Sequence, residues 1–597
     1  MTIARLKKVT VCGLLSEKRC LLEGLQALGC MHLVALRPAP AEVEEVATPH
    51  AEAAIKALRF LTDMHDKRKQ VTRDPSFDVS SVVEQVLDVK ERLRDATDRN
   101  EFLRHRIEQI EPWGDIAYPP LAELAHHRLW FYILPVRKLD ALNQIEHPWQ
   151  IVKRDPRHAY VAVIAEHEPP DDLLPVPRTY TGALPLQAVK AELEDNEIEI
   201  EDIIAERHAL TRYIYLLSVN LAEAENRASL AFADQQTRDE AGITALQGWV
   251  PEAAIEAVQD YVVDAGLACL IEEPGADDAP PTLIEEPAEM RAGVDLAMFY
   301  TVPPYSSWDP TMVLFFSFSL FFAMILSDAG YGLILLILLM SFWRRLGRSE
   351  RGRSYRVLGL SLFGAAVVYG VLVGSYFGVM PTEGSVLATL HVLELDDYEA
   401  MMRFSIVIGV LHLMLANALV AWQKRLNVSA IANFGWILGL AGGLILVEAE
   451  SDGLTMMGLV LLGAGLIAVF LFTSERPIIR SSDYLWRLLD GLKALTGAMG
   501  MFGDVLSYMR LFALGLASAS LALTFNDLAS TIIDAMPGLG LLLAIVLLLL
   551  GHAINLALAV MSGVVHGLRL NFIEFYKWGI TGEGQAFQKF ARKEVKP

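Results

Sequence analysis

Two arginines in the C-terminal half of the sequence stand inside long apolar stretches. Arg510 lies near the middle of residues 496–525, with at least eight apolar or small residues between it and the loop on one side. An arginine at the centre of a bilayer costs about 3 kcal/mol on insertion scales, so such a residue is normally retained for a function. Arg569 is closer to a basic tail, and its side chain has the alternative of reaching the membrane surface as an anchor.

Small residues accompany Arg510 along its helix face. Positions three and four apart share one face of a helix. On this face lie Gly500, Gly503, Ser507, Leu514 and Ala517. Small residues let a second helix approach closely. Asp504 lies half a turn away from this face, and three roles are open to its carboxyl group: a group on a proton path, a cap at the membrane interface, or the counter-charge of Arg510.

The helix face of Arg569 also carries small and polar side chains. They are Asn555, Ala559, Ser562 and His566. Histidine titrates near neutral pH and can relay protons, although a histidine held by a hydrogen bond fits the sequence equally well. The candidate ion-translocation residues are therefore Arg510, Arg569, His566, Ser507, Ser562 and Asp504. We expect no catalytic residue and no metal ligand.

A buried permanent cation suits one kind of chemistry. Arginine does not deprotonate in proteins, so it cannot pass a proton along. It does lower the pKa of a nearby carboxyl group, by about one unit or more. A carboxylate carried past on a neighbouring helix would lose its ion at the arginine and reload beyond it. The same charge would block direct leakage, as the stator of a rotary ion motor must.

The C-terminal half has enough apolar sequence for several membrane crossings of about 20 residues each. The apolar blocks are 311–345, 356–380, 403–423, 431–448, 455–473, 493–527 and 538–574. Six arginines in the 344–356 loop place that loop in the cytoplasm. If the N-terminal half is cytoplasmic too, the first block must cross twice, turning at residues 328–332. The later loop charges then give eight helices, the last two long and tilted, with both termini in the cytoplasm.

The N-terminal half has the composition of a soluble, acidic domain. Residues 1–300 contain 31 Lys and Arg against 52 Asp and Glu, whereas residues 301–597 contain 20 of each. Such acidity excludes nucleic-acid binding, which needs clustered basic residues. The four cysteines include no C-x-x-C pair, so neither a disulfide framework nor a zinc site is expected. No phosphate-binding loop, dinucleotide fingerprint or nucleophile elbow occurs, so we expect no nucleotide hydrolysis and no cofactor.

The fold class is mainly α, with strands confined to residues 1–300. Strand patterns at 7–14, 31–36, 242–250 and 266–272 surround helices near 16–29 and 252–264, and two more strands occur at 128–134 and 159–165. Heptad runs extend from Val86 to Ile110 and from Leu193 to Ala231. We expect a stator-arm-like domain with a long antiparallel coiled coil and two α/β lobes. The proximal lobe is about 1–40 with 240–275, the coiled coil 41–112 with 186–235, the distal lobe 113–185, a linker 273–300, and the membrane domain 301–597.

Several motifs resemble those of a known family. They are LSYMRLFALGLA (506–517), HGLRLNFIEFY (566–576) with GEG (582–584), SDAGYG (327–332), GSYFG (374–378), GVLHL (409–413) and GWVP (248–251). Together they are similar to the membrane stator subunit of V-type and archaeal-type rotary ATPases, the subunit a family, called subunit I in prokaryotes. The similarity extends over essentially the whole chain, and the arginine motif is highly specific.

The resemblance implies roles for particular residues and partners. Arg510 matches the arginine that faces the rotor carboxylates, Arg569 the second arginine of the last helix, and His566 a polar position beside a half-channel. Ala559 stands where relatives can have a glutamate. The implied partners are a rotor ring of c/K-type proteolipid subunits, peripheral-stalk E/G-type subunits, a C/d-type collar subunit and membrane lipids. The implied location is the plasma membrane of a prokaryote.

Two other interpretations belong to different classes of protein. A secondary transporter with a regulatory coiled-coil cytoplasmic domain would have internal repeats, and none is clear within residues 311–575. A membrane receptor would need a kinase, cyclase or dimerisation module, and the sequence contains none. The leading interpretation is a non-catalytic, ion-translocating stator subunit; the choice between H⁺ and Na⁺ is left open.

Overall fold

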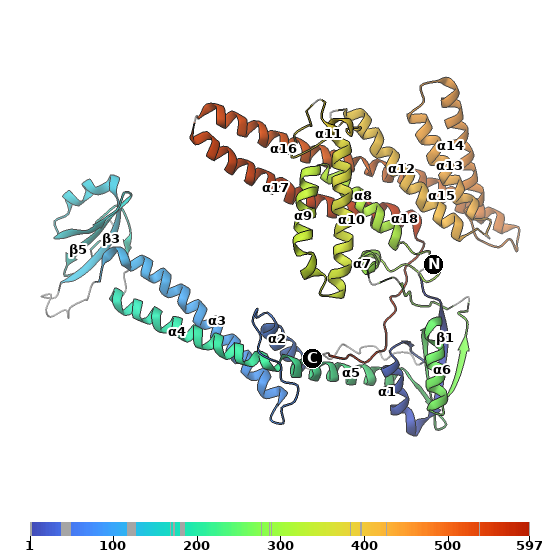
Figure 1. The fold of residues 1–597 in the computed structure, drawn as a ribbon, viewed down its shortest axis with the longest axis horizontal. Helices are drawn as coiled ribbons and strands as arrows, with labels where there is room; N and C mark the ends of the chain where they lie inside the picture. Colours follow the sequence, from blue (N-terminus) through green and yellow to red (C-terminus); the bar gives the residue numbers. More distant parts are fainter. Residues whose placement is uncertain are drawn as a thin grey trace. The chain divides into compact units, whose positions relative to one another are not determined.

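The computed structural model describes residues 3–36, 49–115, 127–167, 169–170, 173–179, 185–275, 278–285, 287, 289–382, 384–394, 397–425, 427–536 and 538–595. The chain divides into two compact units. One unit comprises residues 1–36 with 237–590, and the other comprises residues 37–236 with 591–597. Each unit is described by itself (Figure 1).

An α/β lobe forms the soluble part of the first unit. Its antiparallel sheet has the order β2-β8-β1-β9, with β7 paired to β8. The strands are β1 Leu6–Leu14, β2 His32–Val34, β7 Arg238–Glu240, β8 Ile243–Pro251 and β9 Ala268–Glu272, and the helices are α1 Lys18–Leu28 and α6 Ile255–Asp264. The strand and helix predictions for this region are confirmed.

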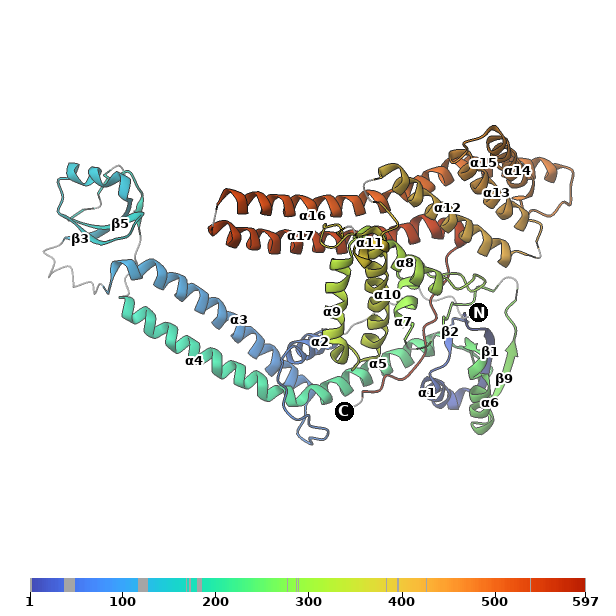
Figure 2. The ribbon, with the colours of Figure 1, turned by 45° about the horizontal axis from the view of Figure 1, so that its top comes forward.

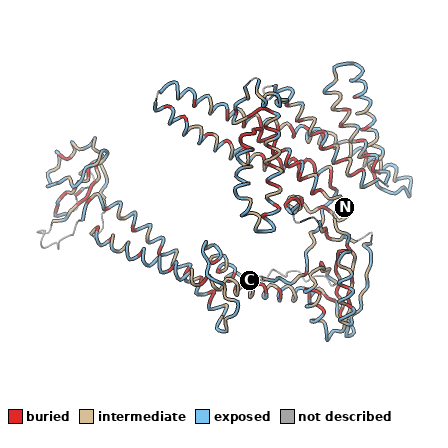
Figure 3. The backbone as a smooth tube through the Cα atoms, viewed as in Figure 1, coloured by how far each residue is buried: buried red, intermediate tan, exposed pale blue. Residues whose placement is uncertain are grey.

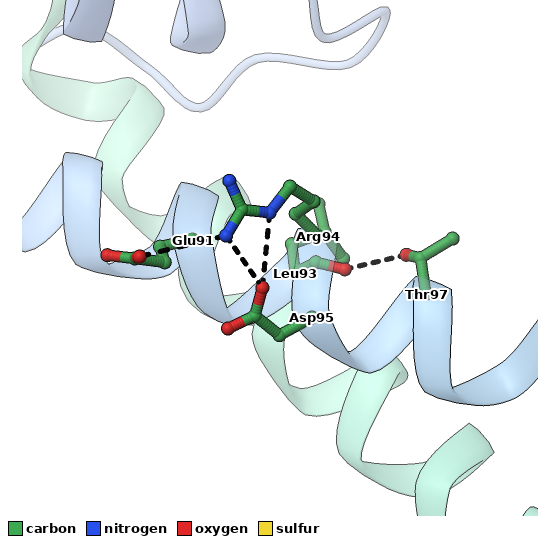
Figure 4. Close-up of polar contacts among 5 residues, drawn as sticks. All are labelled: Glu91, Leu93, Arg94, Asp95 and Thr97. Atoms are coloured by element: carbon green, nitrogen blue, oxygen red, sulfur yellow. Dashed lines mark hydrogen bonds and ion pairs between the residues drawn. The ribbon is translucent and has the colours of Figure 1, made fainter.

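A long helical hairpin and a second sheet form the other unit. Its helices are α2 Pro49–Thr62, α3 Val79–Ile110, α4 Leu186–Leu210 and α5 Ile214–Gln236. Helices α3 and α4 are antiparallel and bury Val86, Val89, Leu103 and Ile203. The second sheet has the order β4-β5-β3-β6, with β3 Arg128–Pro135, β4 Trp149–Arg154, β5 His158–Ala165 and β6 Arg178–Thr179. The outer surface of α3 is polar, as Figure 4 shows for Arg94, which pairs with Asp95 and Glu91.

The second predicted heptad run holds as far as Leu217, which is buried, and is wrong beyond that residue. Instead of Ala224, Ala228 and Ala231, the buried positions of α5 include Ala222, Asn226 and Ala233. A 3-10 turn at Thr211–Tyr213 separates α4 from α5, and the predicted spacing continues across it to the buried Leu217. The buried positions shift by one residue only after Leu217, so a pattern continued at constant spacing selects the wrong face in the last turns of α5.

Helices dominate the rest of the first unit (Figures 1 and 2). They are α7 Arg291–Tyr300, α8 Thr311–Leu326, α9 Ala329–Leu346, α10 Glu350–Val373, α11 Val386–Thr389, α12 Tyr398–Gln423, α13 Ala430–Val447, α14 Asp452–Phe472, α15 Ser482–Ser507, α16 Met509–Ala535, α17 Leu539–Arg569 and α18 Tyr576–Gly579. Helices α16 and α17 run side by side as a hairpin in both views. Buried residues concentrate where α8 meets its neighbours (Figure 3).

The block 311–345 consists of two helices, as predicted. Helix α8 ends at Ser327, which has φ 48°, and the side chain of Asp328 caps α9. Seven helical segments among the described residues are long and apolar enough to cross a membrane, and α8 is shorter, with 16 residues. The last two segments, Ser482–Ala535 and Leu539–Gly579, are long, as expected. The count of eight crossings and the tilt stay predictions.

The predicted linker 273–300 is wrong for its last ten residues. Residues 291–300 form α7, whose Ala292, Gly293 and Ala297 are buried. The Ala292 N–H donates to the hydroxyl of Ser354 on α10. The Pro- and Glu-rich composition had suggested an extended segment, but small side chains on one face allow a helix to pack closely.

Candidate functional site

Tyr508 interrupts the helix that carries Arg510. Helix α15 ends at Ser507 and α16 begins at Met509, with the fully buried Tyr508 between them. Its hydroxyl is 2.8 Å from Nδ1 of His412 on α12. A Cβ atom at Gly409 would come within 2.5 Å of the Tyr508 ring, so only glycine fits there. Tyr508 and His412 therefore fix the start of α16, where Arg510 lies one turn or less away.

A π-helical segment follows Arg569 directly. It spans Leu570–Phe575, and five of its six residues are buried. Asn571 is fully buried, where its Nδ2 donates to the Gly567 carbonyl at 2.9 Å and its Oδ1 accepts from the Ser317 hydroxyl. Glu574 is 2% exposed. Single π turns inside α-helices recur at functional sites, because the wider turn redirects side chains.

Glu574 is the shared counter-charge of the two arginines. Its Oε1 atom lies 3.8 Å from an Nη2 atom of Arg510 and 3.9 Å from Nε of Arg569. The side chain of Arg510 is 23% exposed and that of Arg569 is 51% exposed. Two cations therefore face one buried carboxylate, and the cluster has a formal charge of +1. A buried charge needs a partner, and here one carboxylate serves helices α16 and α17 at once.

The charged cluster is incompletely hydrogen-bonded. Both ion-pair distances exceed those of hydrogen bonds. Oε2 of Glu574 and Nη1 of Arg510 are buried and have no hydrogen-bond partner among the described residues. Native structures leave few buried polar groups in this state, so each one calls for an explanation. The unpaired atoms belong to the Arg510–Glu574 pair itself, whose contact of 3.8 Å is too long for a hydrogen bond.

Asp504 belongs to a different ion pair. Its Oδ2 accepts from Nζ of Lys577 at 2.7 Å and from Nε1 of Trp578 at 2.6 Å. The hypothesis that Asp504 is the counter-charge of Arg510 is therefore wrong, because Glu574 has that position. The hydroxyl of Ser507 donates to the Gly503 carbonyl one turn earlier, at 3.1 Å.

The remaining predicted residues of α17 follow a gradient of exposure. Asn555 and Ala559 are buried, Ser562 and His566 are half-buried, and the Arg569 side chain is the most exposed. Nδ1 of His566 is buried without a hydrogen-bond partner in the described part of the chain. Gly503 on α15 and Ala517 on α16 are exposed, so part of the small-residue face of Arg510 is left open by the described residues.

Sequence reasoning missed Glu574. Residues five apart point in different directions on an α-helix, so Glu574 does not share a helical face with Arg569. A π turn pairs positions i and i+5 and so brings the two together. Two signals were available: Glu574 is an isolated acidic residue in the last apolar block, and it lies in the motif HGLRLNFIEFY. Tyr508 and His412 were also missed as positioning residues, although both lie in the quoted motifs.

Comparison with known proteins gives consistent relatives. The chain is 27% identical to V-type ATP synthase subunit I 1 of Treponema pallidum, over 96% of this chain and 97% of that protein. It is 25% identical to V-type ATP synthase subunit I of Chlamydia pneumoniae, over 90% of this chain and 87% of that protein. With A-type ATP synthase subunit I of Methanocaldococcus jannaschii it is 28% identical, over 68% of this chain and 63% of the relative.

Two further comparisons add little to these relatives. No protein-family model matches the chain. A crystal structure of the cytoplasmic N-terminal domain of subunit I, a homologue of V-ATPase subunit a, is 16% identical and covers 44% of this chain and 99% of that chain, with a TM-score of 0.21. A score this low decides nothing about the fold. The sequence relatives extend over most of the chain, and all three are subunit I of V-type or A-type ATP synthases. Together with the apolar helices they support a multi-pass membrane protein that is similar to this subunit.

Proposed function

We propose that this chain is the membrane-embedded stator of a V/A-type rotary ATPase and that it forms the ion half-channels against a rotor ring. The observation that supports this most directly is the Arg510–Glu574–Arg569 cluster. It holds a permanent cation inside an apolar helix pair, next to a partly open face of small residues. Intramembrane charges mark ion pathways in membrane proteins.

The cluster suggests how a carboxylate passes the stator. A loaded rotor carboxyl group that reaches Arg510 loses its ion, because the adjacent guanidinium stabilises the ionised form. Arg510 then pairs with the rotor carboxylate, while Glu574 stays neutralised by Arg569. When the rotor carboxylate moves on and reloads, Arg510 returns to Glu574. The long contact between Arg510 and Glu574 suits such an exchange, because no short hydrogen bond has to break first.

The same proposal includes the partners and the location. The partners are a ring of c/K-type proteolipid subunits, E/G-type peripheral-stalk subunits, a C/d-type collar subunit and membrane lipids. Residues 1–300 would transmit the torque load to the stalks from the cytoplasmic side of a prokaryotic plasma membrane. Nucleotide chemistry would belong to other subunits, so this chain would be non-catalytic.

Replacement of Arg510 tests the proposal in membrane vesicles that contain the intact complex. Arg510→Ala and Arg510→Lys should each lower ATP-driven ion pumping by about tenfold or more, since a one-unit change in the carboxyl pKa changes the ionised fraction tenfold. Lysine keeps a charge but loses the planar guanidinium. Arg403→Ala, which removes an exposed arginine paired with Glu399, is the matched control and should pump normally. Near-normal pumping by an assembled Arg510→Ala complex would contradict the proposal.

A further inference from the structure

A second polar cluster lies between α16, α17 and the start of α9. The Tyr331 hydroxyl is 2.7 Å from Nδ1 of His552, and Nε2 of His552 is 3.1 Å from Oδ1 of Asn526. Nδ2 of Asn555 donates to the Tyr331 hydroxyl at 3.0 Å and to the Ser518 carbonyl at 2.8 Å. Tyr331 and Asn555 are each 1% exposed. Five residues from three helices therefore form one continuous chain of hydrogen bonds.

The partners of Asn526 fix the direction of every bond in this chain. Nδ2 of Asn526 donates to the Phe377 carbonyl at 2.8 Å, so its Oδ1 faces His552 as an acceptor. Nε2 of His552 must then carry the hydrogen, and Nδ1 is left as the acceptor for the Tyr331 hydroxyl. The Tyr331 oxygen in turn accepts from Asn555. A neutral imidazole is thus held in a single tautomer, with a tyrosine hydroxyl pointing at its basic nitrogen.

The nearest carboxylate supports the cluster from outside the chain of bonds. Oδ1 of Asp328 accepts from the Tyr331 N–H, and Oδ2 accepts from the Ser375 hydroxyl at 2.7 Å and the Gly378 N–H at 3.0 Å. Gly378 has φ 74°, and a Cβ atom there would come within 2.7 Å of Ala522 on α16. Phe377 packs edge-on against both Tyr331 and His552. The SDAGYG and GSYFG segments therefore meet here to position Tyr331.

The cluster lies on the hairpin side of Arg510. Ser518 is eight residues after Arg510 on α16, about 12 Å at 1.5 Å per residue, and Asn526 is about 24 Å along the same helix. Asn526 is half-buried, whereas Ser518 and Asn555 are buried. The hydrogen-bond chain therefore leads from a partly open position near the α16–α17 turn toward the level of the charged cluster.

We propose that His552 and Tyr331 form a proton-exchange pair on the path between the α16–α17 turn and Arg510, and that the transported ion is H⁺. This inference rests on the proposed function. In one transfer, the Tyr331 oxygen takes a proton from water on the Arg510 side while its own proton moves to Nδ1 of His552. The imidazolium then releases its Nε2 proton to water at Asn526. One proton enters and one leaves, and the ring is left protonated on Nδ1 alone. It resets by reorienting about its side-chain bonds, so that the hydrogen bonds to Tyr331 and Asn526 break and the protonated nitrogen comes to face Asn526.

The donor set does not suit a sodium ion. Hard cations are bound by several oxygen ligands, often carboxylates, in a site that replaces their hydration shell. In this cluster the oxygen atoms of Asn526, Tyr331 and Asp328 already accept hydrogen bonds. Neighbouring polar atoms of the cluster are separated by hydrogen-bond distances of 2.7–3.1 Å. A proton can transfer across such a distance, but a metal ion does not fit between the two atoms. Histidine chains are also a known form of proton relay in membranes.

His552→Gln separates a proton-transfer role from a structural one. Glutamine can donate to Asn526 and accept from Tyr331, but it cannot carry a proton through. In vesicles with the intact complex, ATP-driven acidification per assembled complex should fall about tenfold or more, since positioned acid–base groups speed proton transfer by roughly 10²–10⁴-fold. Tyr331→Phe removes only the hydroxyl and should give a comparable loss. His391→Gln, in a loop outside the cluster, is the matched control and should leave acidification unchanged.

Two results would overturn the relay. One is normal acidification by an assembled His552→Gln or Tyr331→Phe complex. The other is ATP-driven uptake of ²²Na⁺ by the wild type that requires Na⁺ and persists when a protonophore is present. Acidification by the wild type in Na⁺-free medium supports H⁺ as the ion. If Arg510→Ala stops pumping while His552→Gln does not, the relay fails and the stator function stands; if Arg510→Ala pumps normally, the stator function itself fails.

Discussion

The helix pair α16–α17 contains two polar clusters that differ in charge and in completeness. Near the start of α16, Arg510, Arg569 and Glu574 form a charged cluster with long contacts and unpaired atoms. Near the hairpin turn, the neutral cluster around His552 and Tyr331 has each donor matched to an acceptor. The first is suited to exchanging an ion-pair partner, and the second to passing a proton between neutral groups at hydrogen-bond distance.

The difference follows from what each cluster costs in an apolar environment. Burying a charged group without a close partner is strongly unfavourable. The charged cluster is stable because the carboxylate of Glu574 compensates part of the charge of both arginines. A neutral group costs little once its hydrogen bonds are formed. A membrane protein can therefore maintain a long neutral chain, but it should confine permanent charge to the place where charge is needed.

The largest effect should come from removing the only negative charge of the charged cluster. Glu574→Gln leaves Arg510 and Arg569 facing each other without a counter-charge. Breaking one partner of a buried pair costs about 3–5 kcal/mol, so we expect poor assembly and a large loss of pumping. Yield of assembled complex and ATP-driven acidification are the measurements. Glu574→Asp keeps the charge and should retain more of both, and equal defects in the two variants would contradict the counter-charge role.

A double variant tests whether the two arginines share Glu574. Arg569→Gln combined with Glu574→Gln restores the formal charge of the cluster to +1. The double variant should therefore assemble better than Glu574→Gln alone, with a coupling of about 0.5–3 kcal/mol between the two positions. Thermal unfolding of the detergent-solubilised complex would measure this coupling. Strictly additive effects would show that Arg569 acts independently, as a membrane anchor.

Sequence patterns predicted the regular parts of this molecule well. Strands β1, β2, β8 and β9 of the first sheet, β3 and β5 of the second, and the two-helix division of residues 311–345 follow from apolar periodicity and from turn residues such as Asp328. Strands β4, β6 and β7 were not predicted. Arg510 and Arg569 stand out because charge is rare in apolar sequence. These features depend on local composition, which a single sequence displays directly.

The features that the sequence did not predict depend on departures from regular helical geometry. The π turn that brings Glu574 to Arg569 and the break at Tyr508 each change the helical phase, and the buried positions of α5 shift by one residue after Leu217. None has a sequence signal as strong as glycine or proline. The neutral cluster was missed for another reason: Tyr331 and His552 are 221 residues apart, and only the fold shows that they meet.

In the neutral cluster, loss of a single hydrogen-bonding group should have a smaller effect. Asn555→Leu keeps the approximate side-chain volume but leaves the Ser518 carbonyl and the Tyr331 oxygen without a donor. Unsatisfied buried groups cost about 1–3 kcal/mol each, so the melting temperature of the complex should fall. Asn571→Leu, in the π turn, is the corresponding change beside the charged cluster. If Asn555→Leu leaves stability unchanged, the neutral cluster is looser than its distances indicate.

The smallest effect concerns a histidine outside the membrane segments, which serves as a reference for His552. Nδ1 of His32 accepts the Gln588 N–H at 2.9 Å, and burial lowers the pKa of His32. Protonation turns Nδ1 into a donor and removes this bond. Because the folded pKa is the lower one, the stabilising contribution is complete above the unfolded value, near 6.5, and is lost as the pH falls below it.

Amide hydrogen exchange at residues 585–590 measures this loss, once rates are corrected for the intrinsic effect of pH. Protection of these amides should decrease between pH 7.5 and 5.5 in the wild type. His32→Gln offers an acceptor that does not titrate, so its protection should be the same at both pH values. Equal protection in the wild type across this range would mean that the tail is held mainly by its backbone bonds to Thr282 and Met31. His32 would then not be the reference that His552 needs.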